Sequence, residues 1–357
     1  MNSHIREAET EVQAGRTRRI EIVLPGKVEP QGLQARTTTA RVPSAGRTLV
    51  RMESTGVSFA EQQMRRGTYF KQPPFPFVPG YDLVGVVDEI GEGVDPSWIG
   101  RRVAAVTKVG AWSTMVDVAA IDLLPVPADL DAAAVEAVIV NGITAWQMLH
   151  DRARVRRGGT IVVLGANGGV GTALVQLARI AGIRVIGTAA TRHHELVRTL
   201  GAEPVDARDP QLYKRIRDLA PDGVDAVFDH VGGSGIRKSW SLLKRGGALI
   251  AYGTASSMGR KSTIALPFLQ LFAQIALWNA LPNGRRAEFY DFWAGKARNP
   301  EKYQAHQATS FAHVVELLGT GTLAPQIAAR FPLDEAGDAL ALAESRTVAG
   351  KIVLQPR

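Results

Sequence analysis

The stretch from Ile161 to Gly171 reads IVVLGANGGVG and decides how the C-terminal half of the chain folds. Its first part, Ile161–Leu164, is a short apolar run typical of a buried strand, and residues 170–181 show the apolar spacing of an amphipathic helix. The turn between them carries four glycines in the frame G-x-x-G-x-x-G, which departs from the strict G-x-G-x-x-G pattern. Small residues let a pyrophosphate approach the backbone, and a helix N-terminus offers free N–H groups. The stretch predicts a dinucleotide-binding turn; a tight turn without a ligand is the alternative.

Strands and helices alternate on both sides of this turn. The Ala-rich segment Asp131–His150 suits a helix before it. After it, the same kind of pattern predicts strands at Arg184–Thr188, Asp225–Asp229 and Ala248–Tyr252 and helices at Glu195–Leu200, Pro210–Leu219 and Ser234–Leu243. Such alternation indicates βαβ units around a parallel sheet.

The first 130 residues follow a different pattern, in which short apolar runs are separated by Gly and Pro turns. Strands are expected at Ile20–Leu24, Thr48–Met52, Leu83–Ile90, Arg102–Val106 and Thr114–Val118. This part of the chain therefore predicts a compact, barrel-like domain. The last 35 or so residues (strand Ile327–Phe331, helix Asp334–Glu344, strand Lys351–Leu354) return to the mixed style and could complete it.

Composition limits the function classes. A chain of 357 residues with 45 % hydrophobic and 21 % charged residues is too long for one average domain and too apolar to be wholly disordered. The absence of cysteine excludes disulfides, thiolate zinc sites, iron–sulfur clusters and a cysteine nucleophile. A formal net charge of +8 is compatible with nucleic acid, a membrane surface or an anionic small molecule as partner.

Two segments bear on targeting. Residues 1–17 contain several charges and no apolar core, so we expect a loose tail rather than a secretory signal. Residues 262–284 lack any charged side chain, but Pro267 and three amide side chains interrupt their apolar run. A buried helix or an apolar lip over a pocket is the favoured interpretation of this segment. We therefore expect no membrane span and a cytoplasmic protein.

The segment Gly187–His194 decides which nicotinamide cofactor is favoured. An acidic residue at the end of the second strand would bind the ribose hydroxyl of NAD, but no carboxylate appears before Glu195. Arg192 could instead make charge-assisted hydrogen bonds to a 2′-phosphate, which favours NADPH. An ordinary exposed arginine is the alternative. His193 and His194 are adjacent and point apart, so a metal site is not expected there.

Several short motifs occur in a specific order. They include PFVPGYD at 76–82, GVV followed by GEGV within 85–94, GITA at 142–145, DHVGG at 229–233, RGG at 245–247 and GKIVL at 350–354. In this order, and together with the glycine turn, they resemble the medium-chain dehydrogenase/reductases over residues 18–357. The resemblance is to their zinc-free quinone oxidoreductase and enoyl reductase branch.

The resemblance implies an α/β fold in which a Rossmann doubly wound parallel sheet is inserted into a β-rich GroES-like barrel domain. The expected boundaries are 1–131 and 322–357 for the GroES-like catalytic domain and 132–321 for the cofactor-binding domain, with the active site in the cleft and a homodimer as the assembly. Zinc-dependent relatives place a cysteine near residues 57–58 and Gly-His-Glu at 80–82. This chain has Gly80-Tyr81-Asp82 and no cysteine, so no metal is expected.

The resemblance also implies site residues. Tyr69 is the expected proton donor, with a packing tyrosine as the alternative, and Ser58 is the expected second catalytic residue, although the family often has Asn-x-x-Asp at 58–61. A lysine often stands where this chain has His193. The cofactor would contact Thr144, Asn167, Gly168, Gly169, Val170, Ala189, Thr191, Arg192, His193, Val231, Tyr252 and Gly253. The substrate pocket would include Phe59, Tyr81, Asn141, Phe268 and Phe272.

Without a metal to polarise a ketone, an electrophilic conjugated acceptor is expected. The leading hypothesis is an NADPH-dependent reductase that transfers hydride to a bulky, apolar quinone or enone. A trans-acting enoyl-thioester reductase and a non-catalytic NADPH-binding or RNA-binding protein are the alternatives. No basic cluster interleaved with aromatic residues is visible, so nucleic acid is the weaker expectation.

Overall fold

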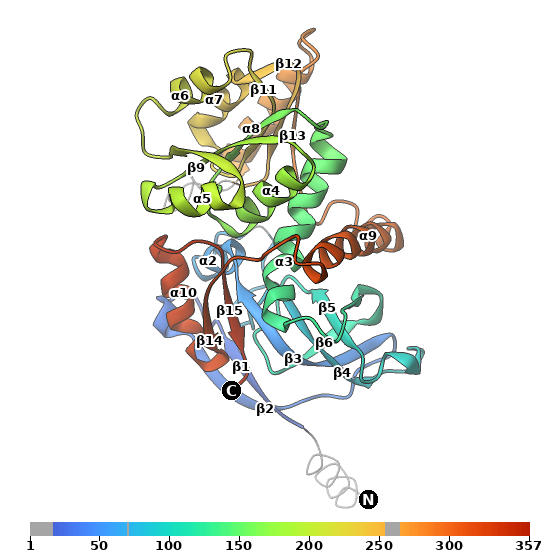
Figure 1. The fold of residues 1–357 in the computed structure, drawn as a ribbon. Coiled ribbons are helices and arrows are strands. Elements are labelled where there is room, and N and C mark those ends of the chain that lie inside the picture. The colour runs from blue at the N-terminus through green and yellow to red at the C-terminus, as the bar shows by residue number, and fades with distance from the viewer. Residues whose placement is uncertain (1–16, 70, 254–264) are drawn as a thin grey trace, which may run out of the picture. The chain divides into compact units, whose positions relative to one another are not determined.

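A computed structural model describes residues 17–69, 71–253 and 265–357, and the chain divides into two compact units (Figure 1). Unit 2 is Ala137–Gln326, and unit 1 comprises the described residues before it together with Ile327–Arg357. Each boundary lies five residues beyond the position expected from the sequence. The first boundary is displaced because the first turn of the helix α3 (Ala132–Trp146) belongs to unit 1, where Glu136 pairs with Lys351.

Unit 2 is built on a six-stranded parallel sheet with the order β10-β9-β8-β11-β12-β13. Numbered along the unit this order is 3-2-1-4-5-6, which is that of doubly wound dinucleotide-binding sheets, and it reverses between β8 and β11. The strands are β8 (Thr160–Leu164), β9 (Arg184–Ala189), β10 (Ala202–Asp206), β11 (Val224–Asp229), β12 (Leu243–Ala251) and β13 (Arg286–Phe289).

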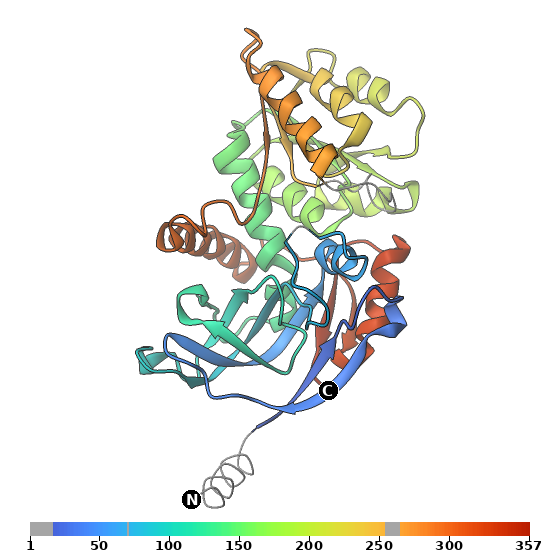
Figure 2. The same ribbon diagram turned by 180° about the vertical axis from the view of Figure 1, so that it is seen from behind.

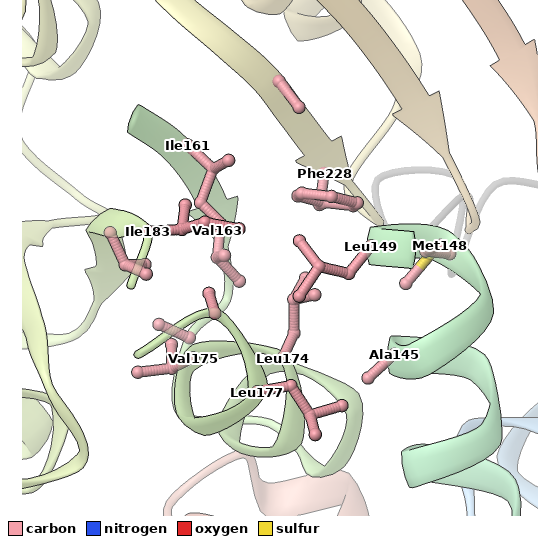
Figure 3. Packing of buried hydrophobic residues seen from close by; sticks show 14 of the residues in the cluster. Ala145, Met148, Leu149, Ile161, Val163, Leu174, Val175, Leu177, Ile183 and Phe228 are labelled. Atoms are coloured by element: carbon pink, nitrogen blue, oxygen red, sulfur yellow. The ribbon is translucent and has the colours of Figure 1, made fainter. Parts of the chain in front are cut away.

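Helices cover both faces of this sheet, which explains the uniformly apolar strand β8. Ile161 and Val163 pack with Leu174 of α4 and Phe228 of β11 on one face (Figure 3), whereas Val162 and Leu164 belong to the cluster on the other face. The first face is covered by α3, α4 (Gly169–Ile180) and α5 (His194–Leu200), and the second by α6 (Leu212–Leu219), α7 (Ile236–Ser241) and α8 (Ala265–Asn279).

Three elements of unit 2, β10, α9 and β13, are absent from the strands and helices expected from the sequence pattern. The helix α9 (Pro300–Gly319) buries a stripe that includes Gln307 and Ser310, so polar residues interrupt its apolar periodicity. The strand β13 has four residues and, within the described part of the chain, pairs with β12 alone, which leaves too short a pattern to recognise.

Unit 1 holds a seven-stranded sheet with the order β14-β15-β3-β4-β5-β7, in which β6 also pairs with β3, and a separate two-stranded sheet of β1 and β2. The C-terminal strand β15 lies antiparallel to β3, so the end of the chain completes this unit. The strands are β1 (Arg18–Val23), β2 (Gln34–Thr39), β3 (Arg47–Val57), β4 (Asp82–Ile90), β5 (Arg102–Val106), β6 (Met115–Ala119), β7 (Leu124–Pro125), β14 (Ile327–Pro332) and β15 (Lys351–Gln355), and the helices are α2 (Phe59–Arg65) and α10 (Ala336–Ser345).

A buried cluster of charges joins four elements of unit 1. The ammonium of Lys351 lies 3.0 Å from Glu136 and 3.5 Å from Asp82, and Glu61 lies close enough to interact electrostatically with Lys351 and Asp82. All four side chains are almost fully buried. Burial raises the pKa of Glu61 and raises that of Glu136 well above its ordinary value, because an ionised carboxylate is costly away from water. The ammonium of Lys351 opposes both shifts, but three carboxyl groups share it.

One helix in the described part of the chain, Ala132–Ala153, is long and apolar enough to cross a membrane, and 83 % of its apolar window is buried within the protein. The uncharged segment that the sequence singled out forms α8, which has 15 residues. It is not a buried helix, because one of its faces is exposed, with Leu269 and Leu277 the most accessible large apolar side chains of that helix.

The raised pKa of Glu136 predicts how the free energy of unfolding depends on pH. The folded state holds this proton more tightly than the unfolded state, so the contribution to stability is complete below pH 4.5 and is lost as the pH rises through the folded pKa. Each unit of pKa elevation corresponds to about 1.4 kcal/mol. Glu136→Gln cannot ionise, so its free energy of unfolding in urea should fall less with rising pH than that of the wild type. Glu92→Gln, on an exposed turn, should retain the wild-type slope. A wild-type slope in Glu136→Gln would contradict the assignment.

Candidate functional site

The glycines of the turn after β8 are required for different structural reasons. Gly165 has φ +72°, which favours glycine, and a Cβ on Gly171 would overlap the carbonyl oxygen of Gly165. Gly165 therefore makes the turn and Gly171 lets α4 pack onto it. A Cβ on Gly168 would meet only one atom, the Gly165 oxygen at 3.4 Å, so this side of the turn stays open. An open backbone here is what a phosphate group needs in order to approach.

The N-terminus of α4 is uncapped by any side chain. Gly168 is the N-cap residue, and its carbonyl accepts the first helical hydrogen bond from Thr172 at 2.8 Å. The N–H groups of the first turn have no partner inside the helix, and the helix dipole places a partial positive charge there. Asn167 and Val170, expected at the cofactor, lie in this turn. The arrangement suits an anion.

Asn141 packs against the glycine turn at Gly169. A Cβ on Gly169 would overlap its amide group, and the amide also donates to the carbonyl of Ala137 at 3.0 Å. The sequence assigned Asn141 to the substrate pocket and Gly169 to the cofactor. The structure brings the two into direct contact, so Asn141 acts in unit 2 as a packing and positioning residue for Gly169.

His230 occupies the point where the strand order reverses. It follows β11, and its Nδ1 donates to the carbonyl of Leu164 at the end of β8 at 2.9 Å. Because a carbonyl only accepts, Nδ1 carries the proton. The imidazole fills the place where a Cβ of Gly165 would lie and packs on Tyr252, with 5.9 Å between ring centroids. His230 belongs to the DHVGG motif, but no role was expected for it, because no local signal shows that it spans two strands.

Asp229 shapes the loop that carries the next expected residues. One of its carboxylate oxygens accepts from the N–H groups of Val231 and Gly232 at 2.9 and 2.8 Å, and the other accepts from Ser239 at 2.7 Å. Val231 is thereby held exposed beyond the carboxyl end of β11. Gly253, after β12, approaches the carbonyl of His230 too closely for a side chain.

The end of β9 carries the residues expected at a 2′-phosphate. Ala189 ends the strand, and Thr191–His193 form one turn of 3-10 helix. Arg192 donates from Nε to Nε2 of His193 at 3.2 Å, and burial together with this guanidinium lowers the pKa of His193. His193 is therefore neutral and holds Arg192 in place, whereas His194 bonds the carbonyl of Ala189 instead.

Thr144 is buried beside a network of polar side chains. The hydroxyl of Tyr290 donates to Gln147 at 2.8 Å, and Gln147 donates to Ser310 at 3.0 Å. Burial raises the pKa of Tyr290, and a hydrogen bond with Thr144 opposes that shift. The network thus holds Thr144, the residue that the family resemblance places near the nicotinamide. The other members of the network, Gln147, Tyr290 and Ser310, were not among the site residues expected from the sequence.

The expected proton donor Tyr69 lies in unit 1 in an aromatic pair. Its hydroxyl donates to the hydroxyl of Tyr81 at 3.1 Å, and the rings meet edge to face with centroids 6.2 Å apart. The ammonium of Lys108 lies 5.6 Å from the centre of the Tyr69 ring. Tyr69 is partly exposed and Tyr81 is buried, so Tyr69 is the member of the pair that solvent and small molecules reach.

Ser58 is engaged in capping α2. Its hydroxyl accepts from the N–H of Ala60 at 3.1 Å and donates to Glu61, whose carboxylate also accepts from the backbone N–H of Ser58. This reciprocal capping box uses both hydrogen-bonding functions of the side chain. Phe59 opens the helix and is half-buried. Ser58 thus has a clear structural role.

The expected pocket residues Phe268 and Phe272 lie on α8. The side chain of Phe268 lies outside the described residues. Phe272 meets Phe289 edge to face with centroids 6.0 Å apart and remains half exposed. Among the residues that the structure describes, no group of three or more His, Cys, Asp or Glu side chains is arranged to hold a metal ion.

Two family models match the chain: the alcohol dehydrogenase GroES-like domain over residues 44–128 and the zinc-binding dehydrogenase family over residues 200–354. The synaptic vesicle membrane protein VAT-1 homolog of Rattus norvegicus is 31 % identical over 330 residues, covering 91 % of this chain and 80 % of the relative. The chain belongs to the zinc-free quinone oxidoreductase branch of the medium-chain dehydrogenase/reductase superfamily.

Solved structures of this superfamily share the fold along almost the whole chain. A mycobacterial quinone oxidoreductase is 26 % identical with a TM-score of 0.78, covering 95 % of this chain and 100 % of its own. A mycobacterial protein solved in complex with NADPH is 25 % identical with a TM-score of 0.80 and the same coverage. The GroES-like unit and the doubly wound sheet expected from the resemblance are therefore confirmed.

The contact between Gly165 and His230 predicts that a side chain at position 165 destabilises the protein. Gly165→Ala adds strain from the positive φ and also displaces the imidazole, so we expect a loss of about 1–3 kcal/mol in the free energy of unfolding. Gly158→Ala has a similar φ of +82° and open space around its Cβ, so it should cost less. In the Gly165→Ala/His230→Ala double variant the overlap is gone, and a double-mutant cycle by urea unfolding should show partial rescue. Strict additivity would contradict this contact.

Proposed function

We propose that the protein is an NADPH-dependent, zinc-independent oxidoreductase that reduces a quinone or an α,β-unsaturated carbonyl compound. The observation that carries the proposal is the open glycine turn at the reversal point of the sheet, with Arg192 rather than a carboxylate after β9. The NADPH complex of a 25 % identical mycobacterial protein supports the cofactor, and the relative named a quinone oxidoreductase supports the acceptor class.

The residues present fit a dinucleotide phosphate. The open backbone at Gly168 and the N–H groups that begin α4 would hold the pyrophosphate, and Arg192, oriented by His193, would bind the 2′-phosphate. Thr144, Val231, Tyr252 and Gly253 are the proposed contacts nearer the nicotinamide. When bound, the reduced nicotinamide supplies the hydride.

Tyr69 is the residue proposed to donate a proton to the acceptor molecule after hydride transfer. Hydride added to carbon of a conjugated acceptor places negative charge on oxygen, which a nearby hydroxyl stabilises and protonates. Tyr81 accepts the Tyr69 hydrogen bond in the free protein and so holds the phenol in one orientation, while the Lys108 ammonium favours the phenolate that remains after proton transfer. Ser58 contributes by capping α2, the helix that precedes Tyr69.

Turnover tests the proposal directly. Purified protein should oxidise NADPH, followed by its absorbance, with some members of a panel of quinones and enones and with little or no activity toward simple ketones. A panel of enoyl thioesters presented as coenzyme A and acyl-carrier-protein derivatives distinguishes the enoyl-reductase alternative. Tight NADPH binding with no oxidation by any acceptor would overturn the proposed activity.

Tyr69→Phe separates catalysis from packing within that assay. Loss of the proton donor should lower kcat by about a hundredfold with a small change in KM, because the ring and its packing are retained. Tyr81→Phe, which removes the acceptor of the hydrogen bond, should lower kcat less. An effect of Tyr69→Phe confined to KM would assign the tyrosine to packing instead.

Arg192→Glu tests the choice of cofactor. Replacing the guanidinium by a carboxylate should weaken NADPH binding by about a hundredfold or more and leave NADH binding within a few-fold, measured by calorimetry. Arg198→Glu makes the same charge change on an exposed turn of α5 and should leave both affinities near the wild-type values. Equal losses for the two cofactors in Arg192→Glu would contradict the role.

A further inference from the structure

The net positive charge of the chain arises in one segment that lacks acidic residues. Residues 230–287 contain eight of the 42 lysines and arginines and no aspartate or glutamate. The remaining 299 residues therefore contain 34 basic and 34 acidic side chains, and the whole net charge of +8 belongs to these 58 residues. An enzyme that needed positive charge only for solubility would have no reason to keep acids out of one segment.

The same segment exposes an apolar helix face. Leu269, Phe272 and Leu277 of α8 are 67 %, 50 % and 64 % exposed, and Ala273 and Ala276 are exposed between them. Spacings of three, four and five residues place all five within one arc of the helix. Leu281, just beyond the helix, continues the apolar surface.

The opposite face of α8 already serves the core. Leu271, Ile275 and Trp278 pack into the cluster under the sheet, and Trp278 stacks on Trp240 of α7 with 4.8 Å between ring centroids. Figure 2 shows α8 in front of the parallel sheet of unit 2. Burial within the unit therefore explains one face of the helix, and the apolar character of the other face needs a separate reason.

Basic side chains gather at the C-terminal end of α8. The Arg285 guanidinium lies 5.8 Å from the centre of the Trp240 ring, and its Nε donates to the carbonyl of Lys244 at 3.3 Å. Lys244 and Arg245 are exposed at the start of β12, and together with Arg285 and Arg217 of α6 they line a cavity of about 220 Å³. Asp222 lines the same cavity, and the Lys244 ammonium lies 2.7 Å from Asp225, so the four cations exceed the two neighbouring carboxylates. The cations thus lie beside the end of the apolar face.

We propose that α8 and the basic residues at its C-terminal end form a docking surface for an anionic lipid bilayer. An amphipathic arrangement of exposed leucine and phenylalanine beside lysine and arginine suits the headgroup region, where the apolar face enters the acyl boundary and the cations meet lipid phosphates. The proposal goes beyond the reductase activity and is independent of it. A symmetric contact with a second copy would instead bring this net-positive surface onto itself.

Vesicle flotation of the full chain tests the surface. The protein should float with vesicles of phosphatidylcholine containing about one phosphatidylglycerol in three, and not with pure phosphatidylcholine. Raising the salt from about 0.05 M to about 0.5 M should lower the bound fraction, because the charge attraction is screened. Failure to bind the anionic vesicles at low salt would overturn the proposal.

Two variants and matched controls locate the binding. Leu269→Gln/Leu277→Gln and Arg245→Glu should each lower the partition onto anionic vesicles by about tenfold or more. Val42→Gln, a single apolar-to-amide change, and Arg41→Glu, the same charge reversal, lie at exposed positions of unit 1 and should leave the partition unchanged. Circular dichroism and thermal melting confirm that each variant is folded.

Three results would assign the face differently and overturn the proposal. The first is equal binding by both variants and the wild type. The second is a wild-type dimer that becomes monomeric in Leu269→Gln/Leu277→Gln while neither protein binds vesicles, which marks an interface between copies. The third is a rise in KM for bulky acceptors in that variant without any vesicle binding, which marks a substrate lip.

Discussion

The close approach of α4 to the end of β8 is the constraint on which the nucleotide-binding half depends. Because Gly171 has no side chain, the first turn of the helix packs against the Gly165 carbonyl, and because Gly165 has none, the His230 imidazole fits between β8 and β11. These two contacts fix the helix N-terminus at the point where the strand order reverses. The partial positive charge of the helix is thereby held in place before any ligand arrives, so no reorganisation is needed to receive a phosphate.

Unit 1 is organised around a different interaction, the burial of Lys351 with three carboxyl groups. Glu61, Asp82 and Glu136 come from α2, β4 and α3, and Lys351 comes from the last strand. A buried charge without its partners is costly, so the cluster favours one arrangement of these four elements over others. Asp82 follows Tyr81 directly and Glu61 caps α2 with Ser58, so the same cluster also holds the segments that carry the proposed proton donor and its partner.

The segment without acidic residues contributes to both the proposed cofactor site and the proposed membrane surface. Residues 230–287 include the loop after β11 that is proposed to meet the cofactor as well as the exposed helix α8. A single acid-free segment would therefore serve two sites, with the loop after β11 near the nicotinamide and the cations beside α8 at lipid headgroups. A reductase held at a bilayer would meet apolar quinones and enones where they concentrate, since such molecules partition into lipid.

Local sequence patterns predicted the strand–turn–helix at Ile161–Gly171, the alternation of strands and helices after it, and the lack of a carboxylate after β9. Each of these features depends only on residues that are neighbours in the chain. The sequence could not find α9, whose buried Gln307 and Ser310 hide its periodicity. The capping box at Ser58 and Glu61 is a local Ser-x-x-Glu pattern that is present in the sequence but was not recognised there. By contrast, the sequence could not place His230 between two strands or join Glu61, Asp82, Glu136 and Lys351 in one cluster. The positions of His230 and of the four charged residues depend on side chains that meet only when the sheets form, so they follow from the long-range contacts of the folded chain.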